Sequence, residues 1–228
     1  MRLAEEQEHE TPHTLICVDE AHFNLVKGRW RGRNVVSHPA TVDVPGQYGG
    51  NITMCAAISE NGVVTHIPSL GPYNTHKLLL FLDRLHSDLI PLHERGLVGP
   101  HLPTFFIVWD NVSFHRGPLI RAWFTAHPRM LMVLLSPSSP FLNPIKEFFS
   151  AWMWRVYEHR AQNQRSLLQA MDGDCGDVTA EQCQGWLRHA CRFLPRCIAR
   201  ENIRCDVDEN LWPDRHERED EQESEDES

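Results

Sequence analysis

The chain has 228 residues, 41% of them hydrophobic, which is enough for one domain with a full core and too few for a second sizeable domain. It contains no signal peptide and no long apolar run, so the sequence predicts an intracellular protein with no membrane partner. The net charge is −9, of which residues 213–228 contribute −7. The rest of the chain therefore has a net charge of about −2, which argues against a strong general DNA binder.

The first predicted strand ends in two acids. Residues 14–18 are apolar and lead directly into Asp19 and Glu20. A carboxylate at the carboxyl end of a buried strand lies where α/β proteins gather catalytic groups. The alternative is that an Asp after a strand only begins a turn.

A basic cluster follows this strand. Lys27, Arg29, Arg31 and Arg33 flank Trp30 and are the best candidates for contact with nucleic-acid phosphates. Because Gly28 and Gly32 alternate with them, a solvated hairpin explains the same pattern equally well.

A second strand repeats the arrangement of the first. The run 105–109 is continuously apolar, as in a strand that is buried on both faces, and it ends in Asp110 and Asn111. Asp110 is therefore the second candidate carboxylate. His115 follows in the same motif and either shapes the site or is a loop histidine satisfied by local hydrogen bonds.

The third motif predicts an amphipathic helix. After the apolar strand 130–135 and a Ser/Pro loop, Pro144 marks the first turn of the helix. At 100° per residue from Ile145, the apolar residues form one wide face, with Lys146 at about 100° on its flank and Glu147 at about 160° on the solvent side. This geometry lets Lys146 reach the Asp19 and Asp110 side chains and keeps Glu147 away from them.

The remaining segments indicate packing helices. Helices are expected at 73–94, where they would cover one face of the sheet, at 118–126 between two parallel strands, and at 166–171 and 180–200. The seven cysteines have no zinc-ligand spacing, so reduced thiols are expected.

The motifs VDEAHF, WDNVSFH and SPFLNPIKEFF together resemble the catalytic core of mariner-like DDE transposases, which have an RNase H-like fold. The resemblance runs from about Leu15 to Val156 and on towards Trp212, and Gly28–Ser59 is similar to the second and third strands of that core. It implies a mixed five-stranded sheet flanked by helices.

The resemblance also implies an organisation of the chain. A polar leader, 1–13, precedes a DDE transposase-like catalytic domain, 14–212, and an acidic tail, 213–228, ends the chain. The tail is expected to be disordered, as a solubilising segment or a mimic of nucleic acid. Only 18 residues precede Asp19, so the helix-turn-helix region of the family is expected to be absent.

The resemblance implies that three carboxylates hold two divalent cations, Mg²⁺ or Mn²⁺, which assist the cleavage and transfer of DNA strands. The first acid corresponds to Asp19, the second to Asp110 and the third to position 146, where this chain has Lys146. DNA is the implied partner, a homodimer the implied assembly and the nucleus the implied location.

The departure at Lys146 leads to a hypothesis. An ammonium group removes one metal ligand and adds a positive charge beside the site, so Lys146 is predicted to form salt bridges with Asp19 and Asp110 in place of one metal ion. The domain would then bind nucleic acid or protein with impaired cleavage. The alternative is an active metal-dependent transposase or nuclease that uses Glu147 as its third acid.

Overall fold

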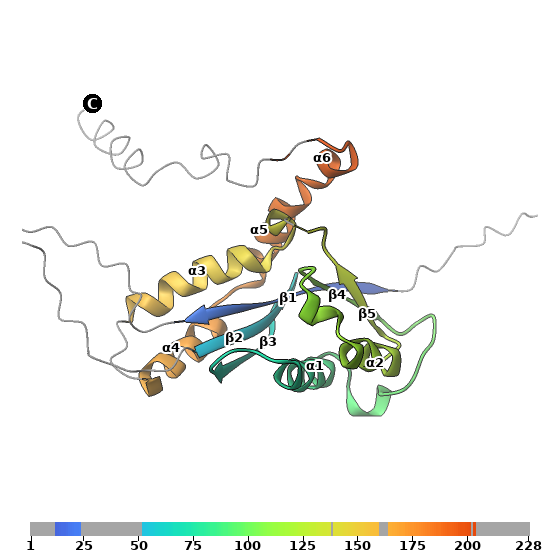
Figure 1. The fold of residues 1–228 in the computed structure, drawn as a ribbon, viewed down its shortest axis with the longest axis horizontal. Helices are drawn as coiled ribbons and strands as arrows, with labels where there is room; N and C mark the ends of the chain where they lie inside the picture. Colours follow the sequence, from blue (N-terminus) through green and yellow to red (C-terminus); the bar gives the residue numbers. More distant parts are fainter. Residues whose placement is uncertain (1–11, 24–51, 138, 160–163, 202, 204–228) are drawn as a thin grey trace, which may run out of the picture.

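A computed structural model describes residues 12–23, 52–137, 139–159, 164–201 and 203 of the chain. The described part contains one sheet and the helices that pack on it (Figure 1). In chain order the elements are β1 His13–Phe23, β2 Ile52–Ser59, β3 Gly62–Leu70, α1 Thr75–Leu89, η1 Leu92–Glu94, β4 Thr104–Trp109, η2 Ser113–Arg116, α2 Pro118–Ala126, β5 Met130–Leu134, η3 Pro140–Leu142, α3 Ile145–Glu158, α4 Gln164–Gly176, α5 Ala180–Cys191 and α6 Leu194–Ile198.

The sheet is mixed and five-stranded, as predicted, with the order β3-β2-β1-β4-β5. β1, β2 and β3 form an antiparallel meander, whereas β4 and β5 run parallel to β1. Helix α2 makes the crossover between β4 and β5, as the sequence indicated. The parallel strands β1 and β4 therefore run in the same direction, and their pairing ends at Cys17 and Val108.

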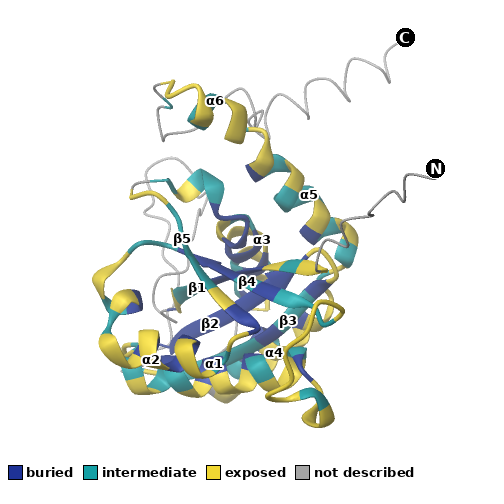
Figure 2. Cartoon of the chain, turned by 90° about the vertical axis from the view of Figure 1, so that its right-hand side faces the viewer, coloured by how far each residue is buried: buried dark blue, intermediate teal, exposed yellow. Residues whose placement is uncertain are grey.

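Helices cover both faces of the sheet and bury two apolar clusters. Successive side chains of a strand point to opposite faces, so Ile16 and Val18 pack with α1 and α2, whereas Cys17 packs with α3, α4 and α5. Figure 2 shows this burial in the strands between the two helical layers. One β-strand thus serves both cores.

Helix α3 buries the face that the sequence predicted. Ile145, Phe148 and Trp152 are each at most 1% exposed, and the Trp152 indole N–H donates to the carbonyl oxygen of Met171 at 3.2 Å. This packing fixes the rotation of α3 and therefore the direction of the side chains in its first turn.

Several element boundaries differ from those expected. β1 continues past Val18 to Phe23, because its outer half pairs with β2, so Asp19 lies inside the strand and not at its end. β3 follows the segment in which the third strand was expected. The helix expected at 73–94 ends at Leu89 and is followed by the separate η1 turn.

Part of the expected organisation lies outside the described residues. This applies to most of the polar leader, to Lys27, Arg29, Arg31 and Arg33, and to the acidic tail. Within the described part, no helix is both long and apolar enough to cross a membrane.

Helix α5 begins with a reciprocal cap, and its removal is expected to cost about 1 kcal/mol of unfolding free energy. The Thr179 hydroxyl accepts from the Gln182 amide, and the Gln182 side chain accepts from the Thr179 amide. Thr179→Ala leaves the Gln182 amide without the hydroxyl acceptor, and urea unfolding would measure the loss. Thr125→Ala is the control, because the exposed Thr125 hydroxyl donates only to a carbonyl within α2. Equal destabilisation by both variants would contradict the capping role.

Candidate active site

The strand register brings Asp19 and Asp110 to the same edge of the sheet. The last pair of the parallel β1–β4 ladder is Cys17 with Val108. Two residues beyond this pair lie Asp19, still within β1, and Asp110, directly after β4. Because neighbouring strands lie about 4.8 Å apart, the two backbones are adjacent at this level.

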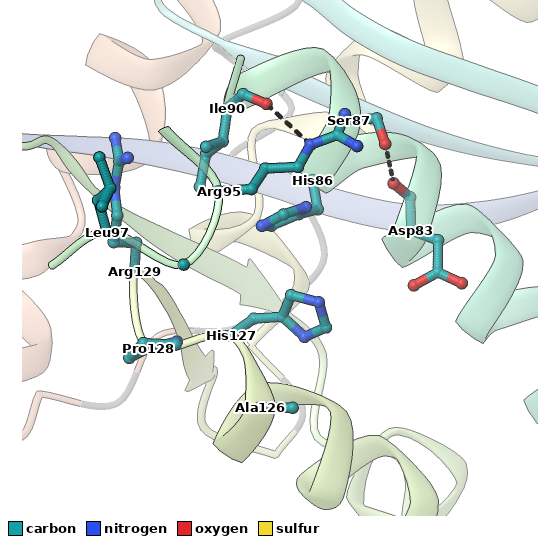
Figure 3. Close-up of a pocket in the computed structure, with 11 residues that line it drawn as sticks. Asp83, His86, Ser87, Ile90, Arg95, Leu97, Ala126, His127, Pro128 and Arg129 are labelled. Atoms are coloured by element: carbon teal, nitrogen blue, oxygen red, sulfur yellow. Dashed lines mark hydrogen bonds between the residues drawn. The ribbon is translucent and has the colours of Figure 1, made fainter. Parts of the chain in front are cut away.

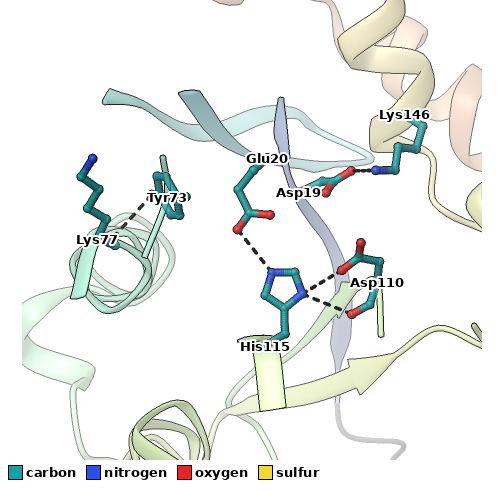
Figure 4. Close-up of polar contacts among 7 residues, drawn as sticks. All are labelled: Asp19, Glu20, Tyr73, Lys77, Asp110, His115 and Lys146. Carbon is teal, nitrogen blue, oxygen red and sulfur yellow. Dashed lines mark hydrogen bonds and ion pairs between the residues drawn. The ribbon is translucent and has the colours of Figure 1, made fainter. Parts of the chain in front are cut away.

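The alternation of side chains along β1 sends its two acids to opposite faces. Asp19 shares the face of Cys17, which α3 covers, whereas Glu20 points to the face covered by α1 and α2. Figure 4 shows Asp19 directed at Lys146 and Glu20 directed at His115. The two acids therefore have different partners.

Lys146 in the first turn of α3 forms an ion pair with Asp19, through Nζ and Oδ2. The Asp19 side chain is 4% exposed and that of Lys146 is 42% exposed. Burial raises the pKa of the Asp19 carboxyl, and the neighbouring ammonium group of Lys146 offsets part of that rise. The buried Asp19 carboxylate thus has the Lys146 ammonium group of the same chain as its counter-ion.

His115 connects the other two carboxylates of the edge. Its Nδ1 lies 2.8 Å from Asp110 Oδ1 and 3.2 Å from the Asp110 carbonyl oxygen, and its Nε2 lies 3.3 Å from Glu20 Oε1. The ring is 1% exposed and stacks on Trp109 with 4.5 Å between centroids. Burial alone would lower the pKa of His115, but the hydrogen bond and charge of Glu20, followed by Asp110, outweigh it and raise the pKa.

The predicted double salt bridge of Lys146 is present only in its Asp19 half. In the described part of the chain, no ion pair joins Lys146 to Asp110, and Asp110 is paired with His115 instead. Of the two interpretations of His115, the loop histidine with local hydrogen bonds is incomplete, since its ring also contacts Glu20, 95 residues away in the sequence.

Glu147 points to a different neighbour. Its carboxylate accepts a hydrogen bond from Nδ1 of His189 on α5, and its side chain is 23% exposed. The helical-wheel expectation of a solvent-facing Glu147 was therefore wrong, because α5 packs over that side of α3. Serving as a third acid would require Glu147 to leave His189.

The described residues do not fit a two-metal centre in this arrangement. Asp19 is paired with an ammonium group and Asp110 with an imidazole. No group of three or more His, Cys, Asp or Glu side chains among the described residues is arranged to hold a metal ion. Divalent cations need several oxygen ligands free of competing cations.

Three residues of this region, Glu20, Asn143 and His189, were given no role from the sequence. Glu20 could have been placed by extending β1, since alternation fixes its face. Asn143, just before α3, is 2% exposed, and its side-chain oxygen and nitrogen have no hydrogen-bond partner among the described residues. Nothing local in the sequence indicates the contact of His189.

A separate pocket of about 420 Å³ lies beside the C-terminal end of α1 and the turn before β5 (Figure 3). Burial and then the neighbouring His127 lower the pKa of His86 in this pocket. None of the predicted site residues lines it. Its lining includes Asp83, His86, Arg95, His127 and Arg129.

The family model described as DDE superfamily endonuclease matches residues 14–168. No curated protein sequence matches the chain. The chain is thus placed by its family model and by solved structures.

Solved structures of the Mos1 transposase share the fold. The chain in the pre-cleavage Mos1 transpososome matches with a TM-score of 0.67 and 15% identity, over 87% of this chain and 58% of that one. The chain in the Mos1 strand transfer complex matches with a TM-score of 0.65 and 16% identity, over 88% and 57%. The catalytic domain of Mos1 mariner transposase matches with a TM-score of 0.57 and 15% identity, over 87% of each chain.

These matches establish the fold and its extent. The chain has the RNase H-like fold of a transposase catalytic domain, as the sequence indicated. It spans somewhat more than half the length of the chains in the two larger Mos1 assemblies.

Proposed function

The chain belongs to the DDE superfamily endonucleases, whose model matches residues 14–168, and we propose that it is a transposase-derived domain with impaired DNA cleavage. It retains binding to nucleic acid or protein, with DNA as the first partner to test. The observation that carries the proposal is the ion pair between Lys146 and the buried Asp19.

The physical argument rests on charge. Mos1 transposase is solved with Mn and with Mg. We propose that Lys146 impairs the binding of such cations in this chain. At position 146 an ammonium group takes the place of a ligand and repels a dication at short range. Displacing Lys146 from Asp19 would also leave a carboxylate that is 4% exposed without its counter-ion.

The contact of Glu147 supports the same conclusion. To become a third acid, Glu147 would have to break its hydrogen bond to His189 and turn towards Asp19 on the flank of α3. That rotation would move Ile145 and Trp152, which are at most 1% exposed, out of their packed positions. Use of Glu147 is therefore the alternative that the following experiment tests.

Nicking of a supercoiled DNA duplex in Mn²⁺ distinguishes the two proposals. We expect no nicking by the natural chain and metal-dependent nicking by Lys146→Glu, because the change restores a third carboxylate and removes the repelling charge. The double variant Lys146→Glu/Asp110→Ala is the control for a contaminating nuclease and should be inactive. Nicking by the natural chain that both Asp110→Ala and Glu147→Gln abolish would instead establish Glu147 as the third acid.

We also propose a nuclear location, since a protein that binds DNA must share its compartment. Imaging of the full chain with a fluorescent tag tests this location. Exclusion of the tagged chain from the nucleus would contradict it.

A further inference from the structure

Helices α5 and α6 carry an unusual run of positive charge. Residues 182–200 contain four arginines and no Asp or Glu. An ordinary solvated helix balances such residues with acids three or four positions away. The absence of these acids distinguishes this segment within a chain whose net charge is −9. The four residues, called the arginine stripe below, are Arg188, Arg192, Arg196 and Arg200.

The stripe follows one flank of an almost continuous helical segment. Arg192 and Phe193, between α5 and α6, keep right-handed helical backbone angles, and the Cys197 amide donates to the Phe193 carbonyl oxygen. With a rise of 1.5 Å per residue, Arg188, Arg192 and Arg196 are about 6 Å apart along the helix and rotated by about 40° from one to the next. The stripe therefore winds slowly along one side. Arg200 follows the end of α6 and has a left-handed backbone, with a φ of 56°.

Its side chains are available to a ligand. Arg188, Arg192 and Arg200 are exposed. Arg196 forms an ion pair with Glu201 at 3.0 Å, in which both side chains are about half exposed. Such a pair contributes little stability and is easily exchanged for another anion. Figures 1 and 2 show α6 beyond the sheet, at the end of α5, and largely exposed.

The near end of the stripe lies beside the candidate active site. His189, between the first two arginines of the stripe, contacts Glu147 in the first turn of α3, and Lys146 precedes Glu147. Phe193 packs against Phe141 of η3 at 5.0 Å between ring centroids, which anchors α5 at the start of α3. A polyanion on the stripe would therefore lead towards the Lys146–Asp19 pair.

We propose that the arginine stripe binds the phosphodiester backbone of DNA. This inference rests on the proposed function, in which DNA is the partner of the domain. Arginine suits the role because its guanidinium group remains charged and donates two parallel hydrogen bonds to a phosphate. Contacts of this kind position DNA without reading its sequence.

Fluorescence anisotropy of a labelled DNA duplex, titrated with the full chain from about 50 to 200 mM salt, tests the stripe. Arg188→Gln/Arg192→Gln is expected to weaken binding at least tenfold at the lowest salt. It should also reduce the slope of log K against log salt by about 1.8, since each lost phosphate contact removes about 0.9. Thermal melting should show that the variant remains folded, because both side chains are exposed.

The matched control removes the same charge elsewhere. Arg121→Gln/Arg165→Gln changes two exposed arginines, on α2 and α4, and should leave the affinity within twofold and the slope unchanged. If both double variants lose affinity equally, net charge explains the binding and the stripe is wrong. If the natural chain binds and the stripe variant matches it, the stripe fails while the proposed DNA binding stands. If the natural chain does not bind DNA at all, both fail.

Discussion

Lys146→Glu is expected to make the thermal stability of the domain depend on divalent metal. In the natural chain the Lys146 ammonium group neutralises the buried Asp19. The substitution places a second carboxylate beside Asp19, so without metal the two negative charges repel and the melting temperature falls. Mn²⁺ at about 100 times its Kd would add about 2.7 kcal/mol. For a domain of this size that corresponds to a rise of about 5–10 °C.

Differential scanning fluorimetry of the natural chain and of Lys146→Glu, each with and without Mn²⁺, measures this effect. Lys146→Gln is the matched control, because it removes the ammonium group without adding a carboxylate. Only Lys146→Glu should gain the rise of several degrees. A similar rise in the natural chain that Asp110→Ala abolishes would mean that the Lys146–Asp19 pair does not prevent metal binding.

The sequence predicts a feature best when local pattern decides it. The buried face of α3 follows from the spacing of Ile145, Phe148 and Trp152, and the structure buries all three. The position of Lys146 on the flank of α3 followed from the same periodicity, and its contact with Asp19 needed only one further fact, the covering of that sheet face by α3.

Features that depend on pairing between distant segments were missed. β1 extends to Phe23 because β2 pairs with its outer half, and no hydrophobic run marks that extension. β3 was missed for a different reason, since it pairs with β2, which directly precedes it. It contains Pro68, which argues against a central strand, but β3 is an edge strand, where proline is tolerated. The contact of Glu147 depends on the docking of α5, 42 residues away in the sequence. The residues near Glu147 in the sequence do not indicate that α5 packs there.

His115→Ala is expected to lower the free energy of unfolding of the domain by about 3 kcal/mol. The ring is 1% exposed and stacks on Trp109, so its removal leaves a cavity. The same change removes the hydrogen bonds of the ring to the Glu20 carboxylate and to the Asp110 carbonyl oxygen. Urea unfolding would measure the loss, with His93→Ala as the control, since the His93 side chain is 81% exposed. Equal losses in the two variants would contradict the structural role of His115.

The pH dependence of stability, compared between the natural chain and His115→Gln, identifies the charge of His115. Its pKa in the folded chain is raised above the ordinary value of 6.5, because Glu20 and Asp110 outweigh the effect of burial. Below pH 6.5 the histidine is protonated in both the folded and the unfolded chain, and its stabilisation is complete. Above pH 6.5 the unfolded chain releases the proton first, so the stabilisation is lost as the pH rises through the folded-state pKa.

The stability difference between the natural chain and His115→Gln should therefore shrink as the pH rises above 6.5. Taking the difference cancels the other histidines, including His86, whose pKa shifts in the opposite direction. A difference that stays constant across this range would mean that His115 is neutral in the folded chain. A neutral ring has one N–H, so it could then donate a hydrogen bond either to Glu20 or to Asp110 but not to both. Lys146 would be the cation that balances this group of carboxylates.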